Sequence, residues 1–127
     1  TSATVAGDKA TVVIESDGKS ETLEFDKLLV SVGRRPLTQE LNLEAVGVAT
    51  DPQTGFVRVD ASLHTSVAGI YAIGDLVPGP MLAHKASAEG KAAAEIIAGK
   101  PGEVNYDAIP SIVYTAPEVA SVGRDDG

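Results

Sequence analysis

The chain has no cysteine and no tryptophan among its 127 residues. Without cysteine, these residues cannot form a disulfide scaffold, a cysteine-ligated zinc site or a thiol nucleophile. The two histidines, His64 and His84, have no metal-ligand partner at a useful spacing. The sequence therefore excludes thiol chemistry from these residues and gives little support to a metal site.

Basic residues are also scarce, with 10 Lys and Arg against 18 Asp and Glu and a formal net charge of −8. Nucleic acids and anionic membranes bind basic surfaces, so we expect neither as a partner. No apolar run approaches the length needed to cross a bilayer. Hydrophobic residues make up 43% of the chain, which is enough for the core of one ordinary domain.

The most informative stretch runs from Ile70 to Gly99. An apolar run, 70–73, ends at Gly74-Asp75, a Pro/Gly-rich loop follows, and an alanine-rich stretch fills 81–98. This order predicts a buried strand, a loop and a helix. In open α/β sheets, ligands bind beyond the carboxyl ends of strands, near helix N-termini.

Two groups in this stretch could bind a ligand. The Asp75 carboxylate could accept hydrogen bonds from sugar or sugar-alcohol hydroxyls. The first helical turn, Met81 to His84, would present free backbone N–H groups to an electron-rich edge. Asp75 would fit a turn-forming role equally well, as Asp commonly does, and the spacing does not separate the two roles.

The N-terminal part predicts a small antiparallel meander. Strands are expected at 10–15 and 21–25, joined by a turn at 16–19 whose Asp-Gly pair supplies positive φ. The continuous apolar run 28–32 predicts a more buried strand. It ends at Gly33-Arg34-Arg35-Pro36, where the arginines could hold a carboxylate or phosphate, although an ordinary basic turn is the simpler interpretation.

Shorter elements are expected elsewhere: a helix at 41–46, a turn at 51–55, and strands at 56–59, 109–114 and 117–123. We expect the alanine-rich helix to stop at Gly99 and Pro101. The last strand has no following element with which to pair, and the chain begins and ends abruptly. These features suggest a piece of a longer chain.

Three segments together resemble the dihydrolipoyl (lipoamide) dehydrogenase family of flavoprotein disulfide reductases: Val32–Pro36, Thr65–Gly90 and Tyr106–Gly123. Gly-Arg-x-Pro and the strand ending in Gly-Asp occur across the wider two-dinucleotide flavoprotein group. Met81-Leu82-Ala83-His84-Lys85-Ala86 at this distance from Gly-Asp is a narrower signal. It separates the chain from glutathione and mercuric reductase relatives.

The resemblance implies an α/β fold, with this chain as an α+β fragment of it. Residues 1–34 would end the NAD-binding domain, 35–105 would form the central domain that completes the FAD site, and 106–127 would begin the dimerisation domain. The resemblance also implies the cofactor-binding residues. Asp75 would bind the ribityl chain of FAD, and Gly33 would lie beside bound NAD. Four residues would line the pyrimidine edge of the flavin, largely through backbone N–H groups: Met81, Leu82, Ala83 and His84.

The implied activity is reoxidation of protein-bound dihydrolipoamide by NAD⁺ through FAD. The implied partners are the lipoyl-bearing acyltransferase of 2-oxo acid dehydrogenase complexes and a second copy in a homodimer. The compartment would be the bacterial cytoplasm, with the mitochondrial matrix as the alternative.

The chain lacks several parts that the family needs for catalysis. It has no redox-active cysteine pair and no Gly-x-Gly-x-x-Gly turn. His84 matches the flavin-side motif, not the catalytic histidine of a C-terminal His-Glu pair. We therefore expect no catalytic residue in this chain and no activity from the chain alone.

Two other functions remain open. The first is another pyridine-nucleotide flavin oxidoreductase, such as a transhydrogenase or NADH oxidase, which the presence or absence of paired cysteines in the full chain would distinguish. The second is a non-catalytic flavin-binding or interaction module. Such a module would fold cooperatively, whereas an isolated fragment would leave strand edges unpaired.

Overall fold

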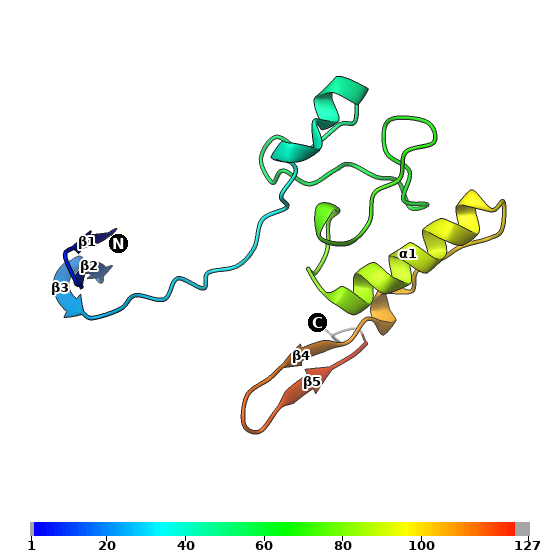
Figure 1. Ribbon diagram of the computed structural model, residues 1–127. Helices are drawn as coiled ribbons and strands as arrows, with labels where there is room; N and C mark the ends of the chain where they lie inside the picture. Colours follow the sequence, from blue (N-terminus) through cyan, green and yellow to red (C-terminus); the bar gives the residue numbers. More distant parts are fainter. Residues whose placement is uncertain (1, 124–127) are drawn as a thin grey trace. The chain divides into compact units, whose positions relative to one another are not determined.

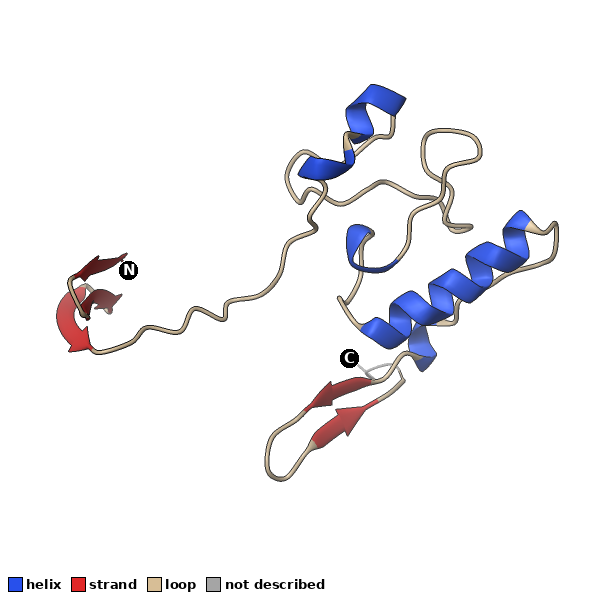
Figure 2. Ribbon diagram, in the orientation of Figure 1, coloured by secondary structure: helices blue, strands red, loops and turns tan. Residues whose placement is uncertain are grey.

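The computed structural model describes residues 2–123, which form two compact units divided between Gly33 and Arg34 (Figure 1). Secondary structure is mixed, with short antiparallel sheets in both units and one α-helix in the second (Figure 2). This agrees with the expected α/β class at the level of mixed helix and strand. Among the described residues, no helix is both long enough and apolar enough to cross a membrane.

The first unit is a three-stranded antiparallel meander of β1 (Ser2–Ala6), β2 (Lys9–Ser16) and β3 (Lys19–Phe25), in that order. The predicted hairpin turn is confirmed, because Asp17 and Gly18 have φ values of +51° and +73°. Ala10 and Val12 alternate along β2 as its buried positions. Strand β1 was not among the expected strands.

The prediction of a buried strand at 28–32 is wrong for this structure. The segment has no regular secondary structure, and Leu29 and Val32 are 88% and 92% exposed. An apolar run becomes a buried strand only when neighbouring strands bond to it and cover its faces. Within residues 2–123, no strand pairs with this run.

The second unit opens with two 3₁₀ helices, η1 (Gln39–Leu41) and η2 (Leu43–Val46), where one short helix was predicted. Asn42 separates them because its φ of +49° lies in the left-handed region. Gly47, with φ of +77°, ends η2 as expected.

The predicted strands at 56–59 and 70–73 are reduced to isolated bridges, Thr50 with Val57 and His64 with Tyr71. Each segment is extended, but only a few hydrogen bonds join it to a neighbour, such as Val57 N–H to Leu76 C=O at 2.8 Å. Both segments still contribute to a buried cluster with the same unit's loops: Val48, Val57, Ala72 and Val77.

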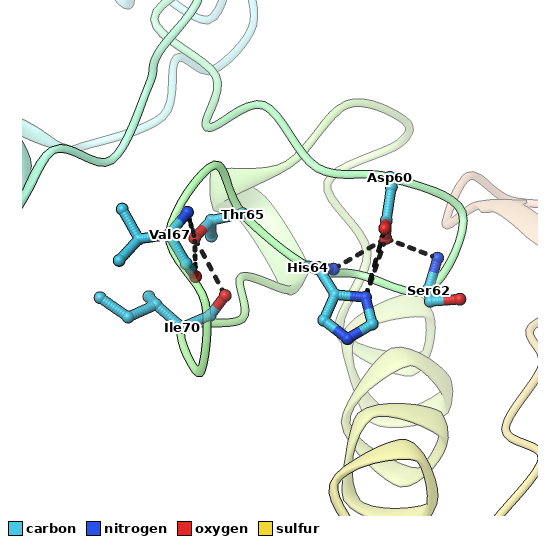
Figure 3. Close-up of polar contacts among 6 residues, drawn as sticks. All are labelled: Asp60, Ser62, His64, Thr65, Val67 and Ile70. Carbon is cyan, nitrogen blue, oxygen red and sulfur yellow. Dashed lines mark hydrogen bonds and ion pairs between the residues drawn. The ribbon is translucent and has the colours of Figure 1, made fainter.

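Hydrogen bonds from side chains to the backbone stabilise the loop that precedes 70–73 (Figure 3). Asp60 Oδ1 accepts hydrogen bonds from the backbone N–H groups of Ser62 and His64, at 2.8 and 3.0 Å, and Thr65 Oγ1 donates to Ile70 C=O at 2.9 Å. Leu63, which lies between Ser62 and His64, has a φ of +64° and is buried. The Asp60 hydrogen bonds stabilise this strained backbone, and the Leu63 side chain packs on the helix that follows.

That helix, α1 (Ala83–Ile97), matches the predicted 81–98 closely, and Gly99 follows its end with φ of +72°. Ala92 and Ala93 are buried against Leu63. The small side chains allow a close approach, because a Cβ on Gly102 would lie 2.3 Å from Ala92 C=O.

After η4 (Tyr106–Ala108), strands β4 (Ser111–Val113) and β5 (Val119–Ser121) form an antiparallel hairpin. The last strand therefore pairs with the strand that precedes it, a partner that the sequence analysis did not consider. Residues 114–118 form the connection that lets it fold back on β4.

We expect Gly74→Ala to lower the free energy of unfolding by about 1–3 kcal/mol. Gly74 has φ of +71°, and an added Cβ would lie 3.2 Å from the Ala86 Cβ. Gly69→Ala is the matched control, because Gly69 has φ of +79° but open space around it. Chemical denaturation measures both, and equal losses would show that contact with α1 adds nothing.

Candidate functional site

Asp75 lies in a one-turn 3₁₀ helix, η3 (Gly74–Leu76), directly after the extended run 70–73. Its side chain is 48% exposed, and the nearest cation is Arg34 Nη1, 3.8 Å from Asp75 Oδ2. An exposed ion pair of this length contributes little to stability. Among the described residues, no hydrogen bond to the Asp75 side chain is present. The carboxylate is therefore available to accept hydrogen bonds from a ligand.

The N-terminus of α1 provides the second part of the site. Leu82 is the extended residue before the helix, and no side chain caps this end. The N–H groups of Ala83, His84 and Lys85 have no acceptor inside the helix, and the helix dipole makes this end positive. Together they favour an electron-rich ligand edge.

The four predicted flavin-edge residues, Met81 to His84, surround this helix start. The Leu82 N–H already donates to Pro80 C=O at 3.0 Å, so this one N–H is not free for a ligand in this structure. The His84 side chain points to another partner, because its Nε2 lies 2.7 Å from Pro110 C=O. A carbonyl only accepts, so Nε2 carries the proton, and the backbone N–H is the group His84 offers to a ligand.

A buried ion pair joins α1 to the Asp75 turn. Lys85 and Glu89 both have fully buried side chains, and Lys85 Nζ lies 3.0 Å from Glu89 Oε1. Lys85 Nζ also donates to Gly74 C=O at 3.0 Å, and Glu89 Oε2 accepts the Gly74 N–H at 2.7 Å. Both backbone groups of Gly74 are therefore bonded to the ion pair.

Sequence reasoning assigned no role to Lys85 or Glu89. A signal was present, because opposite charges four residues apart on an otherwise alanine-rich helix share one face. The spacing alone could not show that this face is buried, since the same pattern occurs at Lys91, which is exposed, and Glu95, which is half-buried.

Tyr106 is the third member of this network. Its hydroxyl donates to Glu89 Oε1 at 3.0 Å. Burial raises the pKa of Tyr106 to about 12, and the hydrogen bond to Glu89 and the Glu89 charge act in the same direction. The tyrosine that begins η4 is therefore stabilised in its neutral, donating form.

We expect Tyr106 to ionise near pH 12, above the ordinary tyrosine value of 10. Because its pKa is raised in the folded state, its contribution to stability is complete below pH 10 and is lost as the pH rises towards 12. An ultraviolet pH titration of tyrosine absorbance compares the protein with Tyr106→Phe. The variant should lack the highest transition, and loss of a transition near pH 10 instead would refute the assignment.

Two further residues were considered in the sequence analysis. Gly33 belongs to the first unit, has φ of +117°, and stays a prediction as a residue beside NAD. His64 is a loop residue, as expected, with Nδ1 3.2 Å from the Asp60 carboxylate and its ring 4.7 Å from that of Tyr71. In the part of the chain that the structure describes, no three side chains form a group that could hold a metal ion.

Residues 1–90 match the family model described as pyridine nucleotide-disulphide oxidoreductase. The chain is 57% identical to a dihydrolipoyl dehydrogenase of Trypanosoma brucei brucei over 115 residues, which are 90% of this chain and 24% of the relative. It is 54% identical to a dihydrolipoyl dehydrogenase of Geobacillus stearothermophilus, over 91% of this chain and 24% of the relative. It is also 50% identical to leghemoglobin reductase of Glycine max, over 94% of this chain and 23% of the relative. The chain thus spans about a quarter of the length of these relatives.

Two solved structures are similar to almost the whole of this chain. LpdA from Mycobacterium tuberculosis matches 97% of this chain with a TM-score of 0.83 at 31% identity, over 26% of its own length. The copper(II) complex of RclA, an HOCl-induced flavoprotein disulfide reductase from Escherichia coli, matches 98% with a TM-score of 0.82 at 25% identity, over 27% of its length. The local folds described above therefore occur within larger proteins of this kind.

Proposed function

Because the chain belongs to the pyridine nucleotide-disulphide oxidoreductase family, we propose that it supplies one side of the FAD site of a dihydrolipoyl dehydrogenase. The observation that carries this proposal is the arrangement around η3. A half-exposed carboxylate stands on a turn that is hydrogen-bonded to α1, and the start of α1 is uncapped. These are an acceptor for sugar-alcohol hydroxyls and a group of donors for an electron-rich ring edge.

The donor and acceptor set fits FAD. Asp75 would accept hydrogen bonds from the ribityl hydroxyls, and the Met81–His84 segment would face the pyrimidine edge through backbone N–H groups. When bound, FAD would supply electron transfer between a dithiol and NAD⁺. The protein's part is to orient the flavin and to stabilise negative charge at that edge through the positive end of α1.

The proposed reaction is reoxidation of protein-bound dihydrolipoamide by NAD⁺, with Gly33 beside the bound NAD. Identity of 57% and 54% to two dihydrolipoyl dehydrogenases supports it. The proposed partners are a lipoyl-bearing acyltransferase and a second copy in a homodimer. The proposed compartment is a bacterial cytoplasm, with the mitochondrial matrix as the alternative; the relatives include both a bacterial and a mitochondrial protein. The proposed domains are 1–34, 35–105 and 106–127.

The second candidate is another flavin oxidoreductase built on the same site. It is supported by the 50% identity to a relative with a different name, leghemoglobin reductase. One experiment separates the two. The whole polypeptide that contains these 127 residues (the full-length polypeptide) is purified, its visible spectrum is recorded, and NAD⁺ reduction is measured with dihydrolipoamide. We expect bound flavin and NADH formation. Bound flavin without dihydrolipoamide turnover would favour the second candidate, and failure to bind FAD at all would refute the site.

We expect the 127 residues by themselves to show no dihydrolipoamide-dependent NAD⁺ reduction. The reaction needs a redox-active pair of thiols, and these residues contain no cysteine. The assay uses the purified 127-residue chain with added FAD, and the full-length polypeptide serves as the positive control. Any turnover by the 127 residues would show that the chemistry does not depend on a cysteine pair.

A further inference from the structure

We propose that Lys85 and Glu89 are positioning residues for the flavin, because together they fix the backbone that orients the Asp75 carboxylate. This inference rests on the proposed FAD site. It assigns a role to two buried side chains that are bonded to each other and to Gly74, not to the reacting atoms or the proposed ligand.

The geometry at Gly74 carries the argument. Its N–H donates to Glu89 Oε2 at 2.7 Å, and its C=O accepts from Lys85 Nζ at 3.0 Å and from the Val77 N–H at 3.3 Å. The C=O belongs to the peptide group that joins Gly74 to Asp75. Because both peptide planes around Gly74 are held, the direction in which the Asp75 side chain leaves the backbone is held as well.

Glycine alone would leave this turn free to move. It has no Cβ and populates positive φ as readily as negative φ. At Gly74 the positive φ of +71° permits the sharp change from the extended run into η3, and the ion pair then selects one conformation. The side chains of α1 thus compensate for the flexibility that the turn requires.

Helix stability does not account for this pair. A buried ion pair loses the hydration of both charges, and apolar side chains of similar size often serve as well or better. Lys preceding Glu by four residues is also the less favourable order along a helix. The hydrogen bonds to Gly74, which apolar side chains could not make, are what this pair adds.

Tyr106 holds Glu89 in the required rotamer. Its hydroxyl bonds Oε1 at 3.0 Å, while Oε2 receives the Gly74 N–H. In the described part of the chain, no buried side-chain nitrogen or oxygen lacks a partner. The network is therefore complete without any group from outside it.

The two residues cannot exchange roles, because Lys85 donates to the Gly74 C=O and Glu89 accepts from the Gly74 N–H. This gives a sharp test. Exchanging the two residues, Lys85→Glu with Glu89→Lys, keeps the composition, the net charge and an i,i+4 ion pair. It places an acceptor against the Gly74 C=O and a donor against the Gly74 N–H. The matched control is Lys91→Glu with Glu95→Lys, which exchanges the same pair of residues at the same spacing on a more exposed face of α1.

The experiment measures FAD affinity by reconstituting the flavin-free full-length polypeptide with FAD. We expect the exchange at 85 and 89 to weaken FAD binding about tenfold or more, and the control exchange to change it by less than about twofold. At saturating FAD, the visible circular dichroism of the bound flavin should also change shape. A loss of stability alone would lower occupancy without changing that shape.

Lys85→Met with Glu89→Gln is the second variant, used if the exchanged protein does not fold by far-ultraviolet circular dichroism. It keeps side-chain volume and removes the bond to the Gly74 C=O. We expect a native fold, weaker FAD binding and an altered flavin spectrum. If Asp75→Ala weakens FAD binding and a folded variant at 85 and 89 binds normally, the positioning role is refuted. If Asp75→Ala itself has no effect, the proposed function fails instead.

Discussion

Replacing Lys85 with methionine is expected to lower the free energy of unfolding by about 3–5 kcal/mol. Lysine and methionine side chains have similar volumes, so the packing around position 85 changes little. The loss arises because the Glu89 carboxylate is fully buried and loses its only positively charged partner among the described residues. The Gly74 C=O loses a hydrogen bond at the same time. Chemical denaturation of the full-length polypeptide measures the effect.

The control is Lys91→Met, six residues along the same helix on an exposed position. We expect it to change stability by less than about 0.5 kcal/mol, as surface substitutions usually do. Adding Glu89→Leu to Lys85→Met should recover part of the loss, because it removes the unpaired charge. Equal effects of Lys85→Met and Lys91→Met would show that the buried pair is not formed in solution.

Asp75→Ala is expected to weaken FAD binding about ten- to hundredfold. Hydrogen bonds to a charged acceptor contribute about 1.5–3 kcal/mol, which corresponds to that range of dissociation constants. Stability of the flavin-free protein should change little, because Asp75 is half-exposed and its 3.8 Å contact with Arg34 is weak. Binding and folding effects are therefore separable at this position.

Titration of flavin fluorescence measures this affinity, with two comparison variants. Asp75→Asn keeps an acceptor without the charge, so we expect a smaller loss than for Asp75→Ala. Glu44→Ala removes an exposed carboxylate from η2 and should leave FAD affinity unchanged. Equal affinities for all three variants would remove Asp75 from the site.

Local signals in the sequence predicted the elements that depend on local interactions. The Asp17–Gly18 turn follows from the positive φ that a tight hairpin needs. The α1 helix follows from its alanine content and from the glycine after its end. For the candidate site, the sequence indicated Asp75 and the start of α1 as neighbouring groups.

Elements that depend on distant partners could not be predicted in the same way. The apolar runs at 28–32 and 70–73 both have strand composition, yet neither forms a regular strand in the described residues. Such a run forms a strand only if a neighbouring strand pairs with it, and the composition of the run does not reveal whether that neighbour is present. The burial of Lys85 and Glu89 was missed for the same reason, because it depends on where Gly74 and Tyr106 pack.

The most direct test of the FAD site is hydrogen–deuterium exchange on the full-length polypeptide with and without FAD. The N–H groups of Ala83, His84 and Lys85 have no acceptor inside the helix, so they should exchange rapidly in the flavin-free protein. On FAD binding, we expect slower exchange in peptides covering 82–86 and 74–76, and no change in the β2–β3 turn at 16–19. Bound FAD with unchanged exchange at both 82–86 and 74–76 would place the cofactor elsewhere and contradict the account.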